Sequence, residues 1–287
     1  MNKSKAVELK NTKNPDVIIF GAGQITNLLI EKLNSIGKSI LCISNNYFNQ
    51  VGIYPNCTIL SYQEIANKKL NAETTIFSWK DASRLNQDNY ALLSWLESDY
   101  FSTKKSILLS SASVYRDSPI SQNEFNTNLE MNPKLNLEIL LKSLRLKHRL
   151  SHTNLRISNI YGINIEYGFI GSLFSSAKSG HEISVFQDMK VIRDYVHVTD
   201  VIDAIEQLIE IDSHDADVNI STGVGTSISE VLEIFAKNGY KFEKRRQIPM
   251  NPEIKQSSVL DCGALSRLIR WHPGQPEDVI TKLLLTI

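Results

Sequence analysis

The chain has 287 residues, 42% of them hydrophobic, so it is long enough to bury a full core in one large domain or two smaller ones. Lys plus Arg and Asp plus Glu both number 31, and a formal charge of zero creates no long-range field that would attract nucleic acid or an acidic membrane. The three cysteines stand apart without the paired spacing of a zinc site, so no metal site is predicted.

The polar start of the chain, residues 1–16, contains no apolar core of the kind found in a signal peptide. No apolar run in the sequence approaches the roughly 20 residues that a membrane-spanning helix needs. We therefore expect neither export nor membrane insertion. A reducing cytoplasm, in which isolated cysteines remain free thiols, is the expected location.

Short apolar runs then alternate with amphipathic segments through the first half of the chain. Such alternation predicts parallel βαβ units in a doubly wound sheet, which is a Rossmann-type α/β fold. After residue 160 the pattern loosens, which indicates a smaller C-terminal region. The expected strands are 16–20, 39–44, 74–79, 106–115 and 153–162, and the expected helices are 24–37, 61–70, 89–101 and 134–149.

The first strand runs into the glycine turn FGAGQIT, residues 20–26. A turn of this kind lets a pyrophosphate approach the backbone at the N-terminus of the next helix, where N–H groups and the helix dipole favour an anion. Gly21 and Gly23 occupy the first two glycine positions, and Gln24 and Ile25 follow as further cofactor-binding candidates. Thr26 occupies the third position, so either the helix lies farther from the strand or the threonine turns away. A plain tight turn is the competing interpretation.

The second strand ends without the acidic residue that usually binds the ribose of a dinucleotide. Ser44, Asn45 and Asn46 stand there instead, and Ser44 is the candidate that would contact a cofactor. The missing acid argues against ordinary NAD recognition, and no nearby arginine favours NADP. The choice between NAD and NADP therefore stays open.

Several later segments resemble the extended short-chain dehydrogenases/reductases, a family of nucleotide-sugar epimerases, dehydratases and reductases. The similar segments are LLSSASVY at 108–115, LRISNIYG at 155–162, VIRDYVHVTDVIDAI at 191–205, and the stretches 219–235 and 258–276, all in the family's order.

The resemblance implies a Rossmann domain over about 14–160, rejoined by about 195–222. It also implies a smaller substrate-binding region from 161–194 and 223–287.

The resemblance also implies roles for three residues on the substrate side. Ser111 matches the serine that holds the reacting oxygen of the sugar, a task that suits a hydroxyl because it both donates and accepts. Arg193 matches a cation that faces the phosphates of the sugar nucleotide, and Asn159 matches a position near the sugar. Other interpretations remain: Ser111 could cap the strand end, Asn159 could serve a turn, and Arg193 could pair with Asp194 or Asp200.

The tyrosine and lysine that share one helix face in this family are both replaced. Lys134 stands at the tyrosine position and Glu138 at the lysine position, and no tyrosine lies between Tyr115 and Tyr161 to restore the pair. An i, i+4 lysine–glutamate pair could simply be helix surface chemistry. A lysine acting as the proton-transferring group is the other interpretation.

Further departures lie on the cofactor side, where bulky Trp79 and charged Lys80 follow the third expected strand and Ser61 replaces a common acid. Two hypotheses follow. The first is an NAD(P)-dependent nucleotide-sugar epimerase, dehydratase or reductase in cell-surface polysaccharide synthesis with an atypical active site. The second is a catalytically silent relative that binds a nucleotide, a nucleotide sugar or a protein partner.

Members of this family often pair through two helices, which implies a homodimer here. The matching helices are 89–101 and 134–150, and the second carries Leu135, Ile139, Leu146 and Leu150. These four side chains would serve either the dimer face or the core, and the core is the expected place for most of them.

Overall fold

The computed structural model describes residues 14–45, 54–65, 68–79, 94–115, 124, 132–148, 150–180, 183–184, 189–212, 216–243 and 257–287. The chain divides into two compact units, each of which is built from several segments. The first unit comprises 1–109, 136–153 and 213–215, and the second comprises 110–135, 154–212 and 216–287. The domain limits expected from the sequence stay a prediction.

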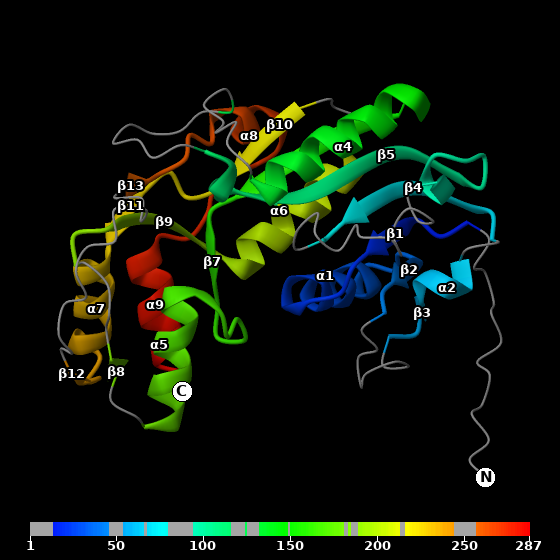
Figure 1. The fold of residues 1–287 in the computed structure, drawn as a ribbon. Coiled ribbons are helices and arrows are strands. Elements are labelled where there is room, and N and C mark those ends of the chain that lie inside the picture. The colour runs from blue at the N-terminus through cyan, green and yellow to red at the C-terminus, as the bar shows by residue number, and fades with distance from the viewer. Residues whose placement is uncertain are drawn as a thin grey trace, which may run out of the picture. The chain divides into compact units, whose positions relative to one another are not determined.

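Seven strands form the parallel sheet of a Rossmann-like fold, so the expected doubly wound α/β class is confirmed. They are β1 (Val17–Phe20), β2 (Ile40–Ile43), β3 (Cys57–Leu60), β4 (Leu70–Phe77), β5 (Phe101–Ser111), β6 (Ser151–Ile157) and β10 (Ala216–Ile220). Their order across the sheet is β10-β6-β5-β4-β1-β2-β3, and Figure 1 labels all of them except β6. Val17 of β1 is in register with Ile40 of β2 on one side and with Thr74 of β4 on the other.

Several features of the strands differ from the prediction. Strands β4 and β5 begin earlier than expected, at Leu70 and Phe101, and β5 ends at Ser111 rather than at 115. Residues 57–60 form β3, which pairs with β2, whereas the sequence interpretation placed no strand there. The single strand expected at 153–162 is in fact two, because the ladder with β10 ends where the Ser158 N–H donates to the Ile220 carbonyl. The next segment, β7 (Asn159–Tyr161), pairs with β9 (Ile192–His197). The apolar run carries no turn residue that would reveal this change of partner.

The helix expected at 61–70 is shorter than predicted, because α2 spans Tyr62–Ile65 and Leu70 already belongs to β4. Two other helices show clear start and stop signals. Helix α1 (Gln24–Ser35) is followed by Gly37 in the left-handed region, with φ 82°. Helix α7 (Ile228–Lys237) begins at a capping box made by Ser227 and Glu230. The other helices are α2 (Tyr62–Ile65), α4 (Pro133–His148), α5 (Gly168–Ser179), α6 (Val198–Glu210), α8 (Gly263–Leu268) and α9 (Pro276–Leu284), with a 3-10 turn η2 (Ala112–Val114).

The second unit also contains small sheets. Strand β9 pairs with β7 and with β13 (Ser257–Ser258) in parallel and with β11 (Gly225–Ser227) antiparallel. Strands β8 (Ile183–Ser184) and β12 (Phe242–Glu243) form a separate two-stranded pair. No helix within the described part of the chain has the length and apolar content needed to cross a membrane.

The core of the first unit is rich in aromatic side chains. Phe20 of β1 lies 5.1 Å from Phe77 of β4, measured between ring centroids, and 6.3 Å from Phe101 of β5. Leu137 and Leu141 of α4 belong to the same buried cluster. The apolar faces of strands and helix thus bury one another, which is the main source of stability in such a layer.

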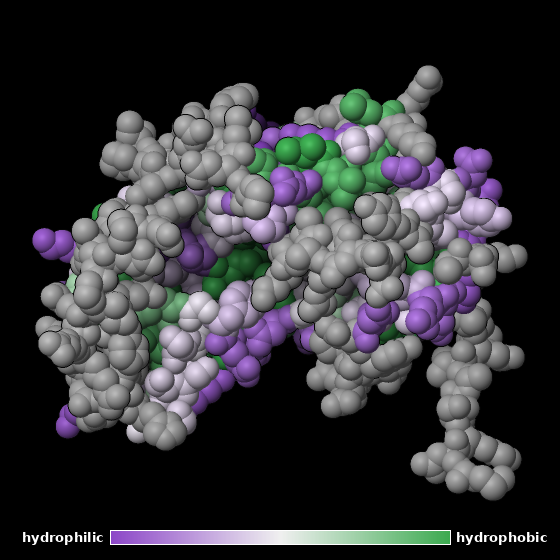
Figure 2. Space-filling view, viewed as in Figure 1, coloured by the Kyte–Doolittle hydropathy of each residue, from purple (hydrophilic) through white to green (hydrophobic). Residues whose placement is uncertain are grey.

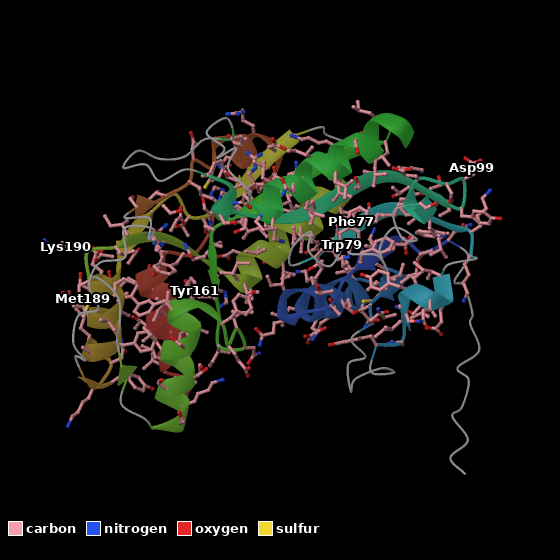
Figure 3. The ribbon with its side chains drawn as sticks, viewed as in Figure 1. Phe77, Trp79, Asp99, Tyr161, Met189 and Lys190 are labelled. Carbon is pink, nitrogen blue, oxygen red and sulfur yellow. The ribbon has the colours of Figure 1, made fainter. Side chains whose placement is uncertain are left out.

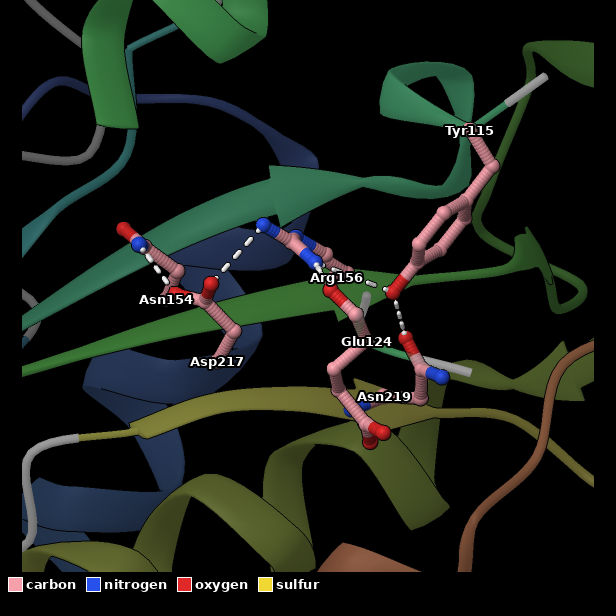
Figure 4. A network of polar contacts seen from close by, with 6 residues as sticks. All are labelled: Tyr115, Glu124, Asn154, Arg156, Asp217 and Asn219. Atoms are coloured by element: carbon pink, nitrogen blue, oxygen red, sulfur yellow. Dashed lines mark hydrogen bonds and ion pairs between the residues drawn. The ribbon is translucent and has the colours of Figure 1, made fainter. Parts of the chain in front are cut away.

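The second unit is held by a buried polar network around Arg156 of β6, drawn in Figure 4. The guanidinium donates to the Asp217 carboxylate at 3.0 Å, to the Glu124 carbonyl at 2.7 Å and to the Tyr115 hydroxyl at 3.3 Å. Asn154 donates to the other oxygen of Asp217 at 2.7 Å. A buried charge is tolerable only when its donors are satisfied, and these contacts supply the partners.

The network extends beyond the arginine through a short hydrogen bond from the Tyr115 hydroxyl to Asn219 of β10. Asn219 in turn donates from its amide to the Asp261 carbonyl at 2.9 Å. The Arg156 guanidinium also lies 5.3 Å from the centroid of the Tyr115 ring. The segment after β5, the strand β10 and the approach to α8 are therefore tied to one buried cation.

Replacing this cation tests the importance of the network. Arg156→Met should lower the free energy of unfolding by about 3 kcal/mol, because removing one partner leaves the Asp217 carboxylate without its compensating charge. Lys104→Met, which breaks an exposed pair with Glu73, is the matched control and should change stability by less than about 1 kcal/mol. Urea denaturation measures both, and equal losses would contradict the account.

Candidate functional site

The order of the main sheet locates a candidate binding edge in the first unit. The chain builds β1, β2 and β3 in one direction and then returns to build β4 on the other side of β1. In α/β sheets, ligands bind outside the carboxyl ends of the strands at such a switch point. The residues that follow β1 and β4 at this point are Gly21 on one side and Ser78 and Trp79 on the other.

The glycine loop fits the diphosphate part of a dinucleotide. Gly21 has φ 96°, and a Cβ at this position would lie 2.7 Å from the Ser78 carbonyl oxygen, so only glycine permits this close turn. A Cβ on Gly23 would meet nothing within 4 Å, and Gly23 begins α1 without a side-chain cap. The described residues therefore leave room around Gly23 at the start of α1, where Gln24 and Ile25 are the first helical residues.

Thr26 resolves the question raised by the missing third glycine. Its side chain is fully buried, and its hydroxyl donates to the Ser78 hydroxyl at 2.9 Å. The threonine is thus turned into a hydrogen bond with the end of β4, which was one of the two expected arrangements.

The ends of β2 and β3 carry hydroxyl and amide groups in place of the usual acids. Ser44 is buried and its N–H donates to the Leu60 carbonyl, while the Asn45 side-chain carbonyl accepts the N–H of Tyr62 at 3.2 Å. Ser61 forms a reciprocal cap with Glu64 at the start of α2. Nothing in these contacts selects NAD over NADP. Asn46 and Lys80 lie outside the described residues.

On the substrate side, Ser111 ends β5 and caps the turn η2. Its hydroxyl accepts the Ser113 N–H at 3.2 Å, which is the capping role considered from the sequence, and a hydroxyl can donate as well as accept. The Ser113 carbonyl accepts from the Asn132 amide at 2.5 Å. Asn132 also accepts the N–H groups of Lys134 and Leu135, so it caps α4 just before Pro133.

Asn132 is a residue that the sequence interpretation did not single out, although an Asn before a Pro at a helix start is a recognisable cap signal. By bonding the serine turn and the first turn of α4 at once, it fixes the backbone of Ser111–Ser113 relative to the backbone of Lys134. The two residue types that could act on a sugar oxygen thus lie on segments joined by one amide.

Glu138 does not lie on the helix surface, so the interpretation of the Lys134–Glu138 pair as surface chemistry is wrong for the glutamate. Its side chain is 1% exposed, whereas Lys134, one turn earlier on α4, is half-buried. Burying a carboxylate requires hydrogen-bonding or charged partners, because desolvation disfavours the charged form.

Asn159 and Arg193 lie on the paired strands β7 and β9. The Asn159 amide donates to the Asp194 carbonyl at 3.0 Å, and the half-buried Arg193 donates to the Ile192 carbonyl at 2.8 Å. The hydrogen bond of Asn159 joins β7 to β9, so this side chain has a structural role.

Asp194 is fully buried and fastens the loop after β10. Its carboxylate accepts from the N–H and hydroxyl of Thr222 at 2.9 and 2.8 Å, from the Gly223 N–H at 3.0 Å and from the Leu260 N–H at 3.3 Å. Burial raises the pKa of Asp194, and these donors oppose that rise. The ion pair with Arg193 that was considered from the sequence would share this carboxylate with four hydrogen-bond donors.

His197 ends β9 in a structural environment. Its Nδ1 lies 2.6 Å from the Thr199 hydroxyl, and its ring meets the Tyr161 ring edge-on at 5.3 Å. Burial lowers the pKa of His197. Among the described residues, no group of three or more His, Cys, Asp and Glu side chains could hold a metal ion.

The lowered pKa of His197 predicts a pH effect on stability. At pH values between the lowered pKa of the folded state and the ordinary value of about 6.5, the unfolded chain binds more protons than the folded chain. The free energy of unfolding therefore falls as the pH decreases below about 6.5. His197→Asn should show a shallower loss between pH 7 and pH 5 in urea denaturation. Parallel curves for the two proteins would contradict the effect.

Comparison with known proteins places this geometry in context. The model of the NAD dependent epimerase/dehydratase family matches residues 80–221. The chain is 23% identical over 239 residues to dTDP-4-dehydro-6-deoxyglucose reductase of Escherichia coli, covering 76% of this chain and 74% of that protein. It is 27% identical over 141 residues to dTDP-4-dehydro-6-deoxy-D-allose reductase of Streptomyces bikiniensis, covering 47% and 43%.

Solved structures share the fold over nearly the whole chain. A UDP-N-acetylglucosamine 4-epimerase from Methanobrevibacter ruminantium, in complex with UDP-N-acetylmuramic acid, matches with a TM-score of 0.75 and 19% identity, covering 95% of this chain and 98% of that one. The UDP-glucose 4-epimerase of Thermus thermophilus, in complex with NAD, also matches with 0.75 and 19%, covering 93% and 97%. On this evidence residues 80–221 form a domain of the NAD dependent epimerase/dehydratase family, and the sequence relatives of the chain are nucleotide-sugar reductases.

Proposed function

We propose that the chain is an NAD- or NADP-dependent enzyme that modifies a nucleotide-linked sugar by epimerisation, dehydration or reduction. The observation that carries the proposal is the linkage of Ser111 and Lys134 through Asn132, which holds a hydroxyl and an amine on joined segments. The relatives named as reductases of dTDP-linked deoxy sugars support this substrate class.

Each substrate-side residue has a proposed role. Ser111 donates its remaining proton to the reacting oxygen of the sugar. Lys134 transfers the proton in place of the missing tyrosine, since an ammonium donates and the conjugate amine accepts. Arg193 binds the phosphates of the nucleotide with its guanidinium fork, and Asn159 contacts the sugar. Glu138 is a buried positioning carboxylate on the same helix.

The cofactor side is proposed to bind the dinucleotide through its diphosphate. Gly21 and Gly23 let the backbone approach the phosphates, and Gln24 and Ile25 contribute N–H groups at the start of α1. Ser44 is the hydroxyl at the end of β2 that is proposed to face the ribose. When bound, the nicotinamide supplies or accepts the hydride. We propose a cytoplasmic role in supplying sugars for cell-surface polysaccharide.

The proposed roles of Lys134 and Ser111 predict large losses of turnover. Lys134→Met and Ser111→Ala should each lower kcat by about 100-fold or more, because a positioned proton-transfer group contributes that much. The assay offers a panel of dTDP- and UDP-linked 4-keto and 4-hydroxy sugars with either dinucleotide and follows nicotinamide absorbance. Lys104→Met, with its exposed ion pair to Glu73, is the control. Unchanged turnover in Lys134→Met would contradict its role.

A homodimer formed through α4 is part of the proposal. Ile139 is 57% exposed and Leu146 is 73% exposed, and their spacing of seven residues places both on one helix face. Figure 2 shows apolar surface over α4. Leu135 and Leu150 are buried, whereas Ile139 and Leu146 are exposed. The core position expected for most of the four side chains is therefore reached by only two of them.

The exposed face of α4 predicts the effect of a charge on assembly. Ile139→Asp combined with Leu146→Asp should halve the mass measured by light scattering at micromolar concentration, because a buried unpaired charge opposes association. Leu285→Asp, which alters an exposed leucine outside α4, should leave the mass unchanged. A wild-type chain that is already monomeric would overturn the dimer.

A further inference from the structure

The switch point in the first unit is already filled by an aromatic side chain. Trp79, the second residue after β4, is 8% exposed, and its ring lies 4.9 Å from Phe77 and 5.9 Å from Phe20 between centroids. Figure 3 shows Phe77 and Trp79 together at the end of β4. A Cβ on Gly21 would lie 3.4 Å from Cδ1 of this indole, so the ring rests directly against the glycine turn.

The indole also bonds to Tyr62, which follows β3. Trp79 Nε1 donates to the Tyr62 hydroxyl at 2.9 Å, and the Tyr62 ring stacks on Phe20 with 6.4 Å between centroids. The Tyr62 N–H is anchored by the side chain of Asn45, immediately beyond β2. Two aromatic rings joined by a hydrogen bond thus connect the end of β4 with the start of α2.

The strand order shows what this connection crosses. Trp79 follows β4 and Tyr62 follows β3, and β1 and β2 lie between those two strands. The Trp79–Tyr62 pair therefore spans the carboxyl ends of β1 and β2. In a dinucleotide site the ribose next to the adenine is bound at the end of β2, while the diphosphate lies at the glycine turn. The pair occupies the adenosine side of this edge.

We infer that Trp79 and Tyr62 form a gate over the adenosine half of the dinucleotide site, and that an adenine ring binds only when the indole leaves its place. This inference rests on the proposed use of NAD or NADP. The indole and an adenine are both flat aromatic rings with a hydrogen-bonding edge, so both suit the same apolar walls, Phe20 and Phe77, and exclude each other. At the start of α1, a Cβ on Gly23 would meet no described residue within 4 Å, so the pair does not cover this glycine.

The contacts of the gate are compatible with its opening. One hydrogen bond joins the indole to Tyr62, and Tyr62 is half-buried in the first turn of a helix of only four residues. The Asn45 contact and the Ser61–Glu64 cap fix the backbone of Tyr62, whereas its hydroxyl accepts the indole N–H. Removing that hydroxyl should therefore weaken the hold on the indole while leaving the backbone of Tyr62 in place.

Calorimetric titration of the full chain with NAD and with nicotinamide mononucleotide, which lacks adenosine, tests the gate. Trp79→Ala should bind NAD at least tenfold more tightly than the wild type. Tyr62→Phe should change affinity in the same direction by about 2- to 10-fold, the effect of one net hydrogen bond. The mononucleotide should bind all proteins equally. Trp95→Phe, in the same aromatic cluster and bonded to the Lys68 carbonyl, is the control and should match the wild type.

Equal NAD affinities for wild type, Trp79→Ala and Tyr62→Phe, including no binding by any of them, would overturn the gate. So would weaker binding by Trp79→Ala with its fold intact by circular dichroism, because the indole would then be a wall of the site. If Trp79→Ala does not fold, the NAD affinity of Tyr62→Phe tests the gate. Turnover of a nucleotide sugar with equal NAD affinities leaves the proposed function standing without the gate. Tighter NAD binding without turnover of any sugar leaves the gate standing without the function.

Discussion

The close approach of the end of β4 to the glycine turn organises the first unit. Gly21 leaves room for the Ser78 carbonyl, which would lie 2.7 Å from a Cβ at this position, so the β1–β4 ladder continues to the Ser78 N–H, which donates to the Phe20 carbonyl at 2.8 Å. The buried hydrogen bond between Thr26 and Ser78 adds α1 to the same junction. A larger residue at Gly21 would have to displace backbone, which cannot yield as a flexible side chain does.

The second unit depends on buried charge in a different way. Arg156 and Asp194 are both removed from water, and each is surrounded by hydrogen-bonding partners from segments far apart in the sequence. Such groups contribute little net stability, but losing a partner leaves a buried charge that is neither hydrated nor paired. Arrangements that separate these partners are therefore unfavourable. The neighbours of these charges, Tyr115 and Arg193, gain fixed backbone positions from this constraint.

The sequence predicts the fold well because its signals are local and repeated. Apolar runs, the Gly37 stop and the order of the family-like segments each indicate the same doubly wound sheet. Strand β3 was missed because its four residues are less apolar and mostly half-buried, unlike the fully buried β1 and β2 of the same length, and the break at Ser158 was missed because a change of strand partner is a tertiary event.

The site is less predictable for the same reason. Asn132 bonds to Ser113 nineteen positions earlier, and Tyr62 bonds to Trp79 across two intervening strands, so neither contact follows from spacing along the chain. Glu138 looks like a surface residue in a helical pattern, and only packing reveals its burial. Bulky Trp79 was recognisable as unusual at its position, but its hydrogen bond to a tyrosine after β3 requires the folded sheet.

The central claim is that this chain binds a nucleotide-linked sugar, and calorimetric titration with dTDP- and UDP-sugars tests it most directly. The account predicts micromolar binding of at least one such ligand, with affinity reduced about tenfold or more in Arg193→Met, because a charged hydrogen bond to phosphate is lost. Absence of binding to every nucleotide sugar, or equal binding by Arg193→Met, would contradict it.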